Sequence, residues 1–319
     1  MDAKVASDFH RLDAESFARA FGVDRLPATC AELIAACDFR HRPLHGAERD
    51  AVILEVIKRI ERDKQVIAAP ERRDVWERGW REALNDYVSS GYAEDKLVPR
   101  FIRPNQPVRL NSEYAMPASD RFELDFVRVV REWMFRTYFA QVPEIHEFGC
   151  GTGFNLLALS QMYPGKPLHG SDFVPASVEL VNQIAAARGL TLKGRLFDMT
   201  APDAAYPLAA GAGVFTFGSI EQLGAKPESF VRFLISKKPA ICVHIEPTVE
   251  LYDEDVLIDY LAALFHKKRG YTEGLLPMLK TLENERTVEL IKVKRLHFGS
   301  LMMEGYSVMA WRPRQPGNA

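Results

Sequence analysis

The stretch Ile145-His-Glu-Phe-Gly-Cys-Gly-Thr-Gly-Phe-Asn155 decides the fold prediction, because an apolar strand is followed by three glycines at alternate positions. Glycine suits a turn where the backbone φ is positive or where a Cβ would block the close approach of another group. The run Phe154–Met162 then supplies a helix. Dinucleotide-binding turns read G-x-G-x-x-G and would need glycine at position 154. The stretch therefore predicts a strand–turn–helix unit that does not bind a nicotinamide or flavin cofactor.

Glu147 adds a chemical constraint, because it places a carboxylate immediately before the glycine turn. A pyrophosphate favours a helix N-terminus that is open to anions. A carboxylate at this position is better suited to a ligand that carries an ammonium group.

Three further segments read as strands that end in polar residues, at 168–172, 194–199 and 214–223. Helix-length connections separate them, and this alternation is typical of a parallel α/β sheet. Ligands bind at the carboxyl ends of the strands in such sheets. Taken singly, each polar residue also has a structural interpretation as a helix N-cap or a turn residue.

With these motifs in order, the chain resembles the class I S-adenosylmethionine-dependent methyltransferase superfamily, whose first motif reads acidic-x-G-x-G-x-G, here Glu147–Gly153. The resemblance covers residues 110–313, and the chain is loosely similar to uncharacterised methyltransferases of bacterial polysaccharide pathways. It implies an α/β fold with a Rossmann-like seven-stranded methyltransferase sheet, a terminal antiparallel hairpin whose final strand lies beside the fifth, and a helical N-terminal region.

The same resemblance implies S-adenosyl-L-methionine as the cofactor. Asp172 would accept hydrogen bonds from both ribose hydroxyls, and Asp198 would lie against the adenine amine with Met199 beside the ring. The implied cofactor-binding residues are Glu147, Gly149, Gly151, Gly153, Asn155, Asp172, Phe173, Asp198 and Met199.

The chain divides into three expected parts. Residues 1–95 have apolar and charged positions at helical spacing and predict a helical region that caps the acceptor site. Residues 96–143 combine a connector broken by three prolines with a long helix over 122–139. Residues 144–313 form the methyltransferase domain, which ends in two β-rich runs over 287–296 and 303–311.

Methyl transfer sometimes needs a base, and three residues near the ends of the fourth and fifth strands are candidates: Glu221, His244 and Glu246. Alternation puts His244 and Glu246 on the same side of their strand. Two alternatives stay open, because His244 also suits a hydrogen-bonded interior position and Glu246 a carboxylate that binds neighbouring amides. Gln222 stands where many small-molecule methyltransferases have a histidine, and it cannot act as a base.

The acceptor is less constrained. Arg103, Arg109 and Tyr114 lie in and after the proline-broken connector and, with Gln222, are candidate substrate-binding residues for a phosphate, carboxylate or nucleotide-sugar. Trp76 and Trp80 are spaced to face a core or the catalytic domain. The basic run at 266–269 complements the C-terminal end of a helix dipole, or it faces an anion.

Composition narrows the function class. The 319 residues carry a formal net charge of -2, the pI is about 6.5 and no basic stripe occurs, so nucleic acid is not the expected acceptor.

Met1–His10 has no apolar run after its charges, no 18-residue apolar segment follows, and the expected location is cytoplasmic. Four cysteines without C-x-x-C spacing predict neither a zinc site nor a disulfide framework. No metal ligand is predicted, since the acids at 253–255 suit a helix start.

Three function classes follow. The first is an enzyme that methylates an oxygen or nitrogen of a small, anionic or sugar-like acceptor. The alternatives are a protein methyltransferase and a non-catalytic pseudoenzyme or partner protein that keeps the fold. The retained glycines and Asp172 favour an enzyme, because a pseudoenzyme is free to lose them.

Overall fold

The computed structural model describes residues 9–67 and 72–314. Residues 1–8, which hold most of the segment considered for a signal peptide, lie outside the described residues. Within those two ranges, none of the helices has both the length and the apolar character of a membrane span.

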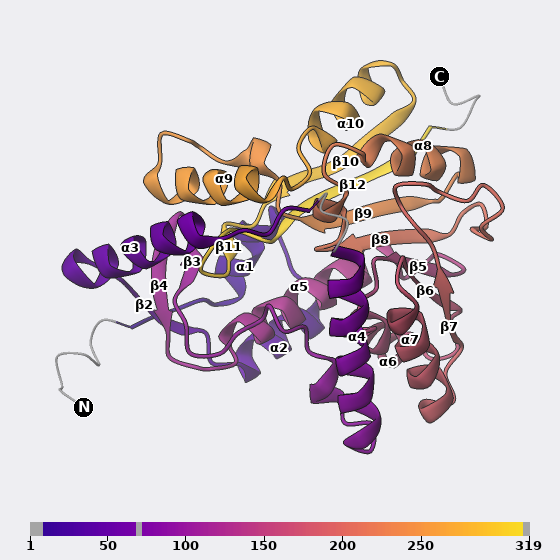
Figure 1. Cartoon of the computed structure of the whole chain (residues 1–319), viewed down its shortest axis with the longest axis horizontal. Helices are drawn as coiled ribbons and strands as arrows, with labels where there is room; N and C mark the ends of the chain where they lie inside the picture. The colour runs from indigo at the N-terminus through magenta and orange to yellow at the C-terminus, as the bar shows by residue number, and fades with distance from the viewer. Residues whose placement is uncertain (1–8, 68–71, 315–319) are drawn as a thin grey trace.

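A seven-stranded mixed sheet forms the centre of the molecule (Figure 1). Its order is β10-β12-β9-β8-β5-β6-β7, in which β5 to β9 run parallel and β12 is antiparallel to both of its neighbours, β9 and β10. The strands are β5 (Ile145–Phe148), β6 (Leu168–Asp172), β7 (Leu192–Leu196), β8 (Gly213–Phe217), β9 (Ile241–Glu246), β10 (Val288–Arg295) and β12 (Ser307–Pro313). The hairpin prediction is confirmed, and the final strand lies beside the fifth parallel strand.

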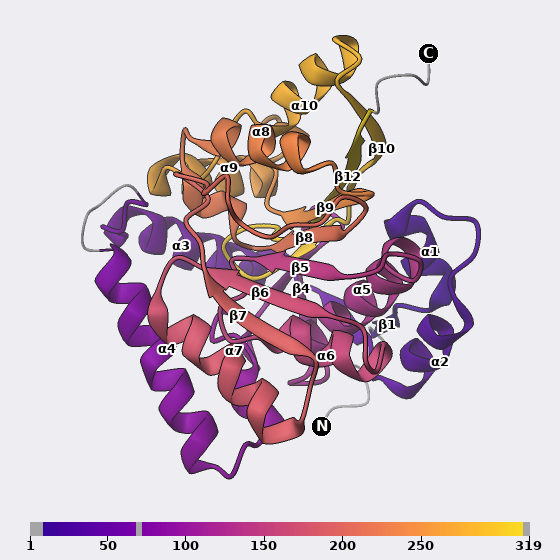
Figure 2. The same ribbon diagram turned by 90° about the vertical axis from the view of Figure 1, so that its right-hand side faces the viewer.

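Helices cover both faces of this sheet (Figure 2). One core packs α5, α6 and α7 against the sheet, and a second core packs α8 and α10 against the other face. Their bounds are α5 (Phe122–Tyr138), α6 (Phe154–Met162), α7 (Pro175–Arg188), α8 (Pro227–Lys237), α9 (Leu257–Arg269) and α10 (Leu275–Asn284). The predicted long helix over 122–139 is therefore confirmed as α5.

Local sequence signals define where these helices begin and end. Helix α7 has Pro175 at its first position, where the missing N–H removes no intrahelical bond, and it ends at Gly189 in the left-handed conformation. Helix α8 likewise begins with Pro227. Two short 3-10 segments, η3 (Ile220–Leu223) and η4 (Val249–Leu251), follow β8 and β9 at the sheet edge where ligands are expected.

The N-terminal region is mainly helical, as expected, but it also contributes strands. The helices are α1 (Ala14–Phe21), α2 (Ala28–Ala36), α3 (Gly46–Arg62) and α4 (Arg72–Ser89), followed by the 3-10 segment η2 (Glu94–Leu97). An antiparallel sheet of order β1-β2-β4-β3-β11 joins β1 (His10–Arg11) and β2 (Arg40–Pro43) to β4 (Glu113–Pro117), β3 (Val108–Leu110) and β11 (Phe298–Gly299). Local periodicity missed β1 and β2, because their partners are distant in sequence.

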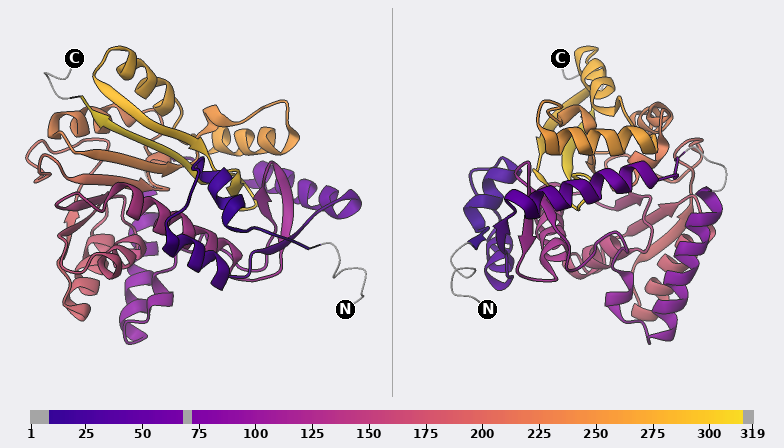
Figure 3. Two further views of the ribbon diagram at one scale, coloured as in Figure 1. Left: turned by 180° about the vertical axis from the view of Figure 1, so that it is seen from behind. Right: turned by 60° about the vertical axis from the view of Figure 1, so that its left-hand side comes forward.

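The four N-terminal helices have different neighbours. Helices α1 and α2 join the α5 core, where the Phe21 ring stacks on Trp133 with centroids 4.5 Å apart. Helix α3 packs beside α9, and α4 lies along α7 (Figures 1 and 3). Only α3 and α4 therefore approach the edge of the sheet where the glycine turn lies.

Candidate active site

A cavity of about 600 Å³ opens at the carboxyl ends of β5 and β8. Its floor is the glycine turn after β5, and one wall is the segment Phe217–Gln222 after β8. Side chains of α3 and α4 form a second wall, and the segment between β11 and β12 closes the third. The N-terminal and C-terminal parts of the chain thus both contribute to one site.

The glycine turn tolerates no side chain at its two cavity-lining glycines. Gly149 has φ +74°, and a Cβ there would lie 2.3 Å from the Cβ of Ser219. Gly151 has φ +49°, and its Cβ would lie 3.1 Å from the Trp80 ring of α4. Gly153 caps α6 and its Cβ would meet Ile184, so this third glycine serves helix packing rather than the cavity.

Glu147 is buried in the cavity wall directly below this turn. Its Oε1 accepts a hydrogen bond from Asn155 Nδ2 at 2.7 Å, whereas its Oε2 is buried and has no partner. Asn155 Oδ1 is also buried without a partner. Burial raises the pKa of Glu147 to about 8. Two acceptor atoms are therefore left unsatisfied at one point of the wall, which suits a bound donor that carries positive charge.

Asp172 does not line the cavity, and both of its oxygens are engaged by backbone groups. Its Oδ2 accepts from the Gly151 N–H at 3.0 Å, and its Oδ1 accepts from the Val174 N–H at 3.2 Å. Burial raises the pKa of Asp172 to about 6. The side chain is thus a brace for the glycine turn. The neighbouring Phe173 is covered by Arg73 of α4, whose guanidinium lies 5.9 Å from the ring centroid.

The predicted adenine residues also lie outside the cavity wall. Asp198 accepts hydrogen bonds from the N–H and the hydroxyl of Thr200, at 2.8 and 2.7 Å, and so forms a local turn. Met199 packs against the second core, and its Cε lies 3.6 Å from the Cβ position of Gly149. Met199 is therefore next to the glycine turn but is not part of the cavity wall.

Glu221 and Gln222 both line the cavity. Gln222 Nε2 donates to Glu221 Oε1 at 3.0 Å, and Gln222 Oε1 accepts from Arg72 Nη2 at 2.8 Å. Burial raises the pKa of the Glu221 carboxyl above its ordinary range. Of the three candidate bases, Glu221 is the one that faces the cavity, and Gln222 connects it to α4.

His244 lies in the protein interior, as one of the two sequence interpretations allowed. It is fully buried between two polar groups: Trp311 Nε1 donates to its Nε2 at 2.9 Å, and its Nδ1 lies 2.9 Å from the hydroxyl of Thr216. Burial lowers the pKa of His244 to about 3. The imidazole is neutral and satisfied, and it has no access to the cavity.

Glu246 supports the loop that carries Glu221. Its two oxygens accept from the Ser219 N–H at 3.1 and 2.9 Å, and its Oε2 also accepts from the Glu221 N–H at 3.4 Å. Burial raises the pKa of Glu246, and the charge of Glu221 raises it further. Glu246 thus binds neighbouring backbone amides, as one of its two sequence interpretations allowed, and it does not line the cavity.

The candidate acceptor residues separate into two groups. Arg103 lines the cavity. Arg109 is fully buried and donates to the carbonyl oxygens of Leu301 and Ile258 and to the Tyr114 hydroxyl. Arg109 and Tyr114 thus hold the small sheet against the segment after β11, outside the cavity wall.

Several lining residues escaped the sequence analysis as site residues. Glu123, in the first turn of α5, has Oε1 3.4 Å from the Tyr306 hydroxyl that donates to it, and its Oε2 is buried without a partner. Burial raises the pKa of Glu123 to about 7. An acid in a first turn is an ordinary dipole partner, so no sequence signal singled it out.

Helix α4 supplies an aromatic and cationic wall. The rings of Trp76 and Trp80 stack with centroids 5.3 Å apart, and the Arg72 guanidinium lies 5.0 Å from the centroid of Trp76. Arg72 Nε is buried without a partner. Arg269, at the end of α9, completes this wall and pairs with Asp63 at 2.7 Å. The i, i+4 spacing of the tryptophans was visible in the sequence, but the surface they face was not.

No protein-family model matches the sequence, and no curated protein is significantly similar to it. Solved structures do match. A SAM-dependent methyltransferase from Aquifex aeolicus is 15% identical, with a TM-score of 0.42 over 58% of this chain and 89% of its own. Magnesium protoporphyrin IX methyltransferase from Synechocystis PCC 6803, crystallised with SAH, is 15% identical, with a TM-score of 0.42 over 59% and 82%. The cyclase SpnF is 13% identical, with a TM-score of 0.46 over 60% and 82%.

At this level of identity the similarity concerns the fold alone. The sheet itself is more informative. Five parallel strands, a glycine turn after β5 and an antiparallel β12 inserted beside β9 are the features that the resemblance predicted. The chain has the fold of the class I S-adenosylmethionine-dependent methyltransferases.

Proposed function

We propose that the chain is an enzyme that transfers the methyl group of S-adenosyl-L-methionine to an oxygen or nitrogen of a small, anionic or sugar-like acceptor. One observation carries this proposal. The carboxylate of Glu147 lies in the cavity wall beside the glycine turn with one oxygen unpartnered, and a buried acceptor atom of this kind needs a donor from a ligand.

The residues present fit the amino-acid half of the cofactor. Glu147 Oε2 and Asn155 Oδ1, both unpartnered, would accept hydrogen bonds from its ammonium group. Gly149 and Gly151 leave the backbone of the turn bare for close contact. Asp172 would act by bracing this turn, and the stacked rings of Trp76 and Trp80 offer a flat apolar surface for a purine.

The bound cofactor supplies an electrophilic methyl group on a positively charged sulfur. An acceptor oxygen or nitrogen held in the cavity would take this methyl group and release a proton. Glu221 is positioned to take the proton that the acceptor loses, because its carboxylate faces the cavity and its raised pKa makes it a stronger base than an exposed glutamate. Glu246 holds the loop of Glu221 in place.

The proposed class of acceptor follows from the positive charge of the arginines that line the cavity. Arg72, Arg103 and Arg269 line the cavity, and the buried Nε of Arg72 has no partner within the described chain. Guanidinium groups bind carboxylate and phosphate oxygens through paired hydrogen bonds. Helices α3 and α4 would thus act as the acceptor-site cap, with their cationic side chains holding a phosphate or carboxylate of the acceptor.

The test combines binding and turnover. Isothermal titration with S-adenosylhomocysteine measures the cofactor site, and radiolabelled methyl transfer is then screened with uronic acids, sugar phosphates and nucleotide-sugars against their neutral counterparts. Glu221→Gln should keep cofactor affinity and lose about 100-fold or more in kcat, the usual contribution of a general base.

Arg72→Ala should raise the KM for an anionic acceptor and leave cofactor binding unchanged, which separates the acceptor wall from the cofactor site. Full activity of Glu221→Gln would remove this residue from the mechanism. Cofactor binding without transfer to any small acceptor would favour the alternatives, a protein substrate or a non-catalytic partner protein. No cofactor binding at all would overturn the proposal.

A further inference from the structure

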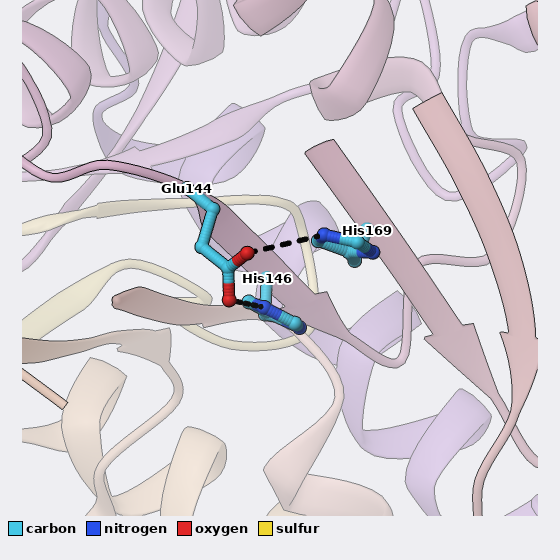
Figure 4. A group of neighbouring side chains, drawn as sticks. All are labelled: Glu144, His146 and His169. Atoms are coloured by element: carbon cyan, nitrogen blue, oxygen red, sulfur yellow. Dashed lines mark hydrogen bonds and ion pairs between the residues drawn. The ribbon is translucent and has the colours of Figure 1, made fainter. Parts of the chain in front are cut away.

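A cluster of three side chains lies at the opposite end of β5 from the glycine turn (Figure 4). Glu144 immediately precedes β5, His146 is the second residue of β5, and His169 is the second residue of β6. The two histidines are direct partners in the parallel register of these strands. Because directly paired residues point to the same face of a sheet, both imidazoles meet the same carboxylate.

The distances in this cluster are close to those of a coordination sphere. His146 Nε2 lies 2.9 Å from Glu144 Oε1, and His169 Nε2 lies 3.6 Å from Glu144 Oε2. The donor atoms of all three residues lie within 4.8 Å of one another. In a tetrahedral site with bonds of about 2.0–2.1 Å, neighbouring ligand atoms are about 3.3 Å apart. The two observed separations lie on either side of that value.

One ring must turn for the lone pairs to converge, because the imidazoles are stacked at 4.2 Å with an angle of 15° between their planes. His169 has the freedom to do so. Its side chain is 16% exposed, and its Nδ1 has no hydrogen-bond partner. Glu144 is 21% exposed, so water has access to complete the coordination. Formation of the site would therefore require a rotation of the His169 ring.

His146 is already held in the orientation that a metal ligand requires. Its Nδ1 lies 3.2 Å from the Tyr206 hydroxyl, which in turn lies 2.7 Å from the hydroxyl of Ser171. Such a partner on the second ring nitrogen fixes the ring plane and the tautomer of a ligating histidine. With Nε2 on the metal, the Nδ1–H would donate to Tyr206.

The chemistry of the cluster suits a transition-metal ion. It offers two imidazole nitrogens and one carboxylate, the ligand types that zinc and related ions accept.

We propose that Glu144, His146 and His169 bind one divalent transition-metal ion of the zinc class. The site lies at the amino ends of β5 and β6, whereas the cavity lies at the carboxyl ends of β5 and β8, so the ion would tie the strand starts together and take no part in methyl transfer. The sequence analysis missed this site because its ligands are 23 residues apart, from 146 to 169, and only the adjacency of β5 and β6 brings them together.

The experiment uses the full-length, metal-stripped protein with zinc chloride alone as the probe. Isothermal titration should show one zinc per chain, and zinc should raise the midpoint of thermal unfolding while the affinity for S-adenosylhomocysteine stays unchanged. Cobalt(II) should give visible d–d bands without the near-ultraviolet thiolate band that a cysteine ligand would produce. No stoichiometric zinc binding would overturn the proposal and leave the cluster as a hydrogen-bonded carboxylate–imidazole group.

Two variants on the solvent side locate the ion. Glu144→Gln and His169→Gln should each weaken zinc binding more than tenfold, whereas His45→Gln, at an exposed histidine that caps no backbone group of α3, should not change it. Unchanged affinity in both variants would place the ion elsewhere and refute the assignment. If a variant does not fold, the histidine ring protons of the wild type settle the location: zinc must shift the His146 and His169 signals in the NMR spectrum, and unshifted signals refute the site.

Discussion

Replacing Glu147 by glutamine should move stability and ligand binding in opposite directions. Glutamine keeps the shape of the side chain and the bond from Asn155, but it cannot carry a charge. Burial raises the pKa of Glu147 from 4.5 to about 8. The folded state therefore holds a proton more tightly than the unfolded state does, and the free energy of unfolding falls as the pH rises from about 4.5 to about 8.

The magnitude follows from the two pKa values. At 1.36 kcal/mol per pKa unit, the full difference corresponds to about 5 kcal/mol, of which about 3–4 kcal/mol is lost between pH 5 and pH 8. The variant lacks this contribution. Any constant cost of burying the new amide cancels when the variant is compared with the wild type at two pH values. The difference in unfolding free energy should thus shift by about 3–4 kcal/mol in favour of Glu147→Gln from pH 5 to pH 8.

Ligand binding should respond in the other sense. If Glu147 accepts a hydrogen bond from the ligand ammonium, the variant loses a charge-assisted bond worth about 1.5–3 kcal/mol. The dissociation constant for S-adenosylhomocysteine should then rise by about 10- to 100-fold.

Urea unfolding followed by circular dichroism at pH 5, 6, 7 and 8 measures the first effect, and isothermal titration measures the second. Glu123→Gln is the matched control, because Glu123 is a buried acid of the same cavity with a pKa raised to about 7. It should show a similar but smaller pH effect, and because Glu123 does not adjoin the glycine turn, it should weaken the binding of S-adenosylhomocysteine less than Glu147→Gln does. Identical pH dependence and identical affinity in Glu147→Gln and the wild type would refute the reasoning.

Two other substitutions test the structural roles of site residues. His244→Ala should lower the free energy of unfolding by about 2–4 kcal/mol, because it removes a buried side chain and leaves two polar partners unsatisfied. The kcat per folded molecule should stay the same. A loss of kcat with unchanged stability would instead show that His244 takes part in the mechanism. Gly149→Ala should lower stability more than Gly165→Ala does, by about 1–3 kcal/mol in chemical denaturation, since both positions have positive φ but only the Gly149 Cβ meets Ser219. Equal effects of the two substitutions would show that the turn has room for a side chain.

The sequence by itself determined the elements whose signals are local. Periodicity located α3, α4 and α5, the glycine spacing placed the turn after β5, and two β-rich runs predicted the terminal hairpin. These features need only near neighbours along the chain, so they can be derived without knowing which elements meet. The acid of the first motif was also placed correctly, because Glu147 adjoins the turn in sequence as well as in space.

Only the tertiary structure decided which polar groups face the cavity. Glu221 and His244 were both candidate bases in the sequence. The Trp311 side chain of the neighbouring strand β12 donates a hydrogen bond to His244, whereas Glu221 lies in η3 and lines the cavity. Asp172 binds the glycine turn because the pairing of β5 and β6 brings its carboxylate beside the N–H of Gly151, which donates a hydrogen bond to it.

The aromatic and cationic wall of α4 and the histidine cluster both depend on contacts between elements that are distant in sequence. Trp80 reaches Gly151 because α4 packs along α7, and His146 meets His169 because β5 and β6 are neighbours in register. Burial and long-range packing set the charge, the partner and the exposure of each such group. Those quantities depend on residues distant in sequence, so no local pattern contains them.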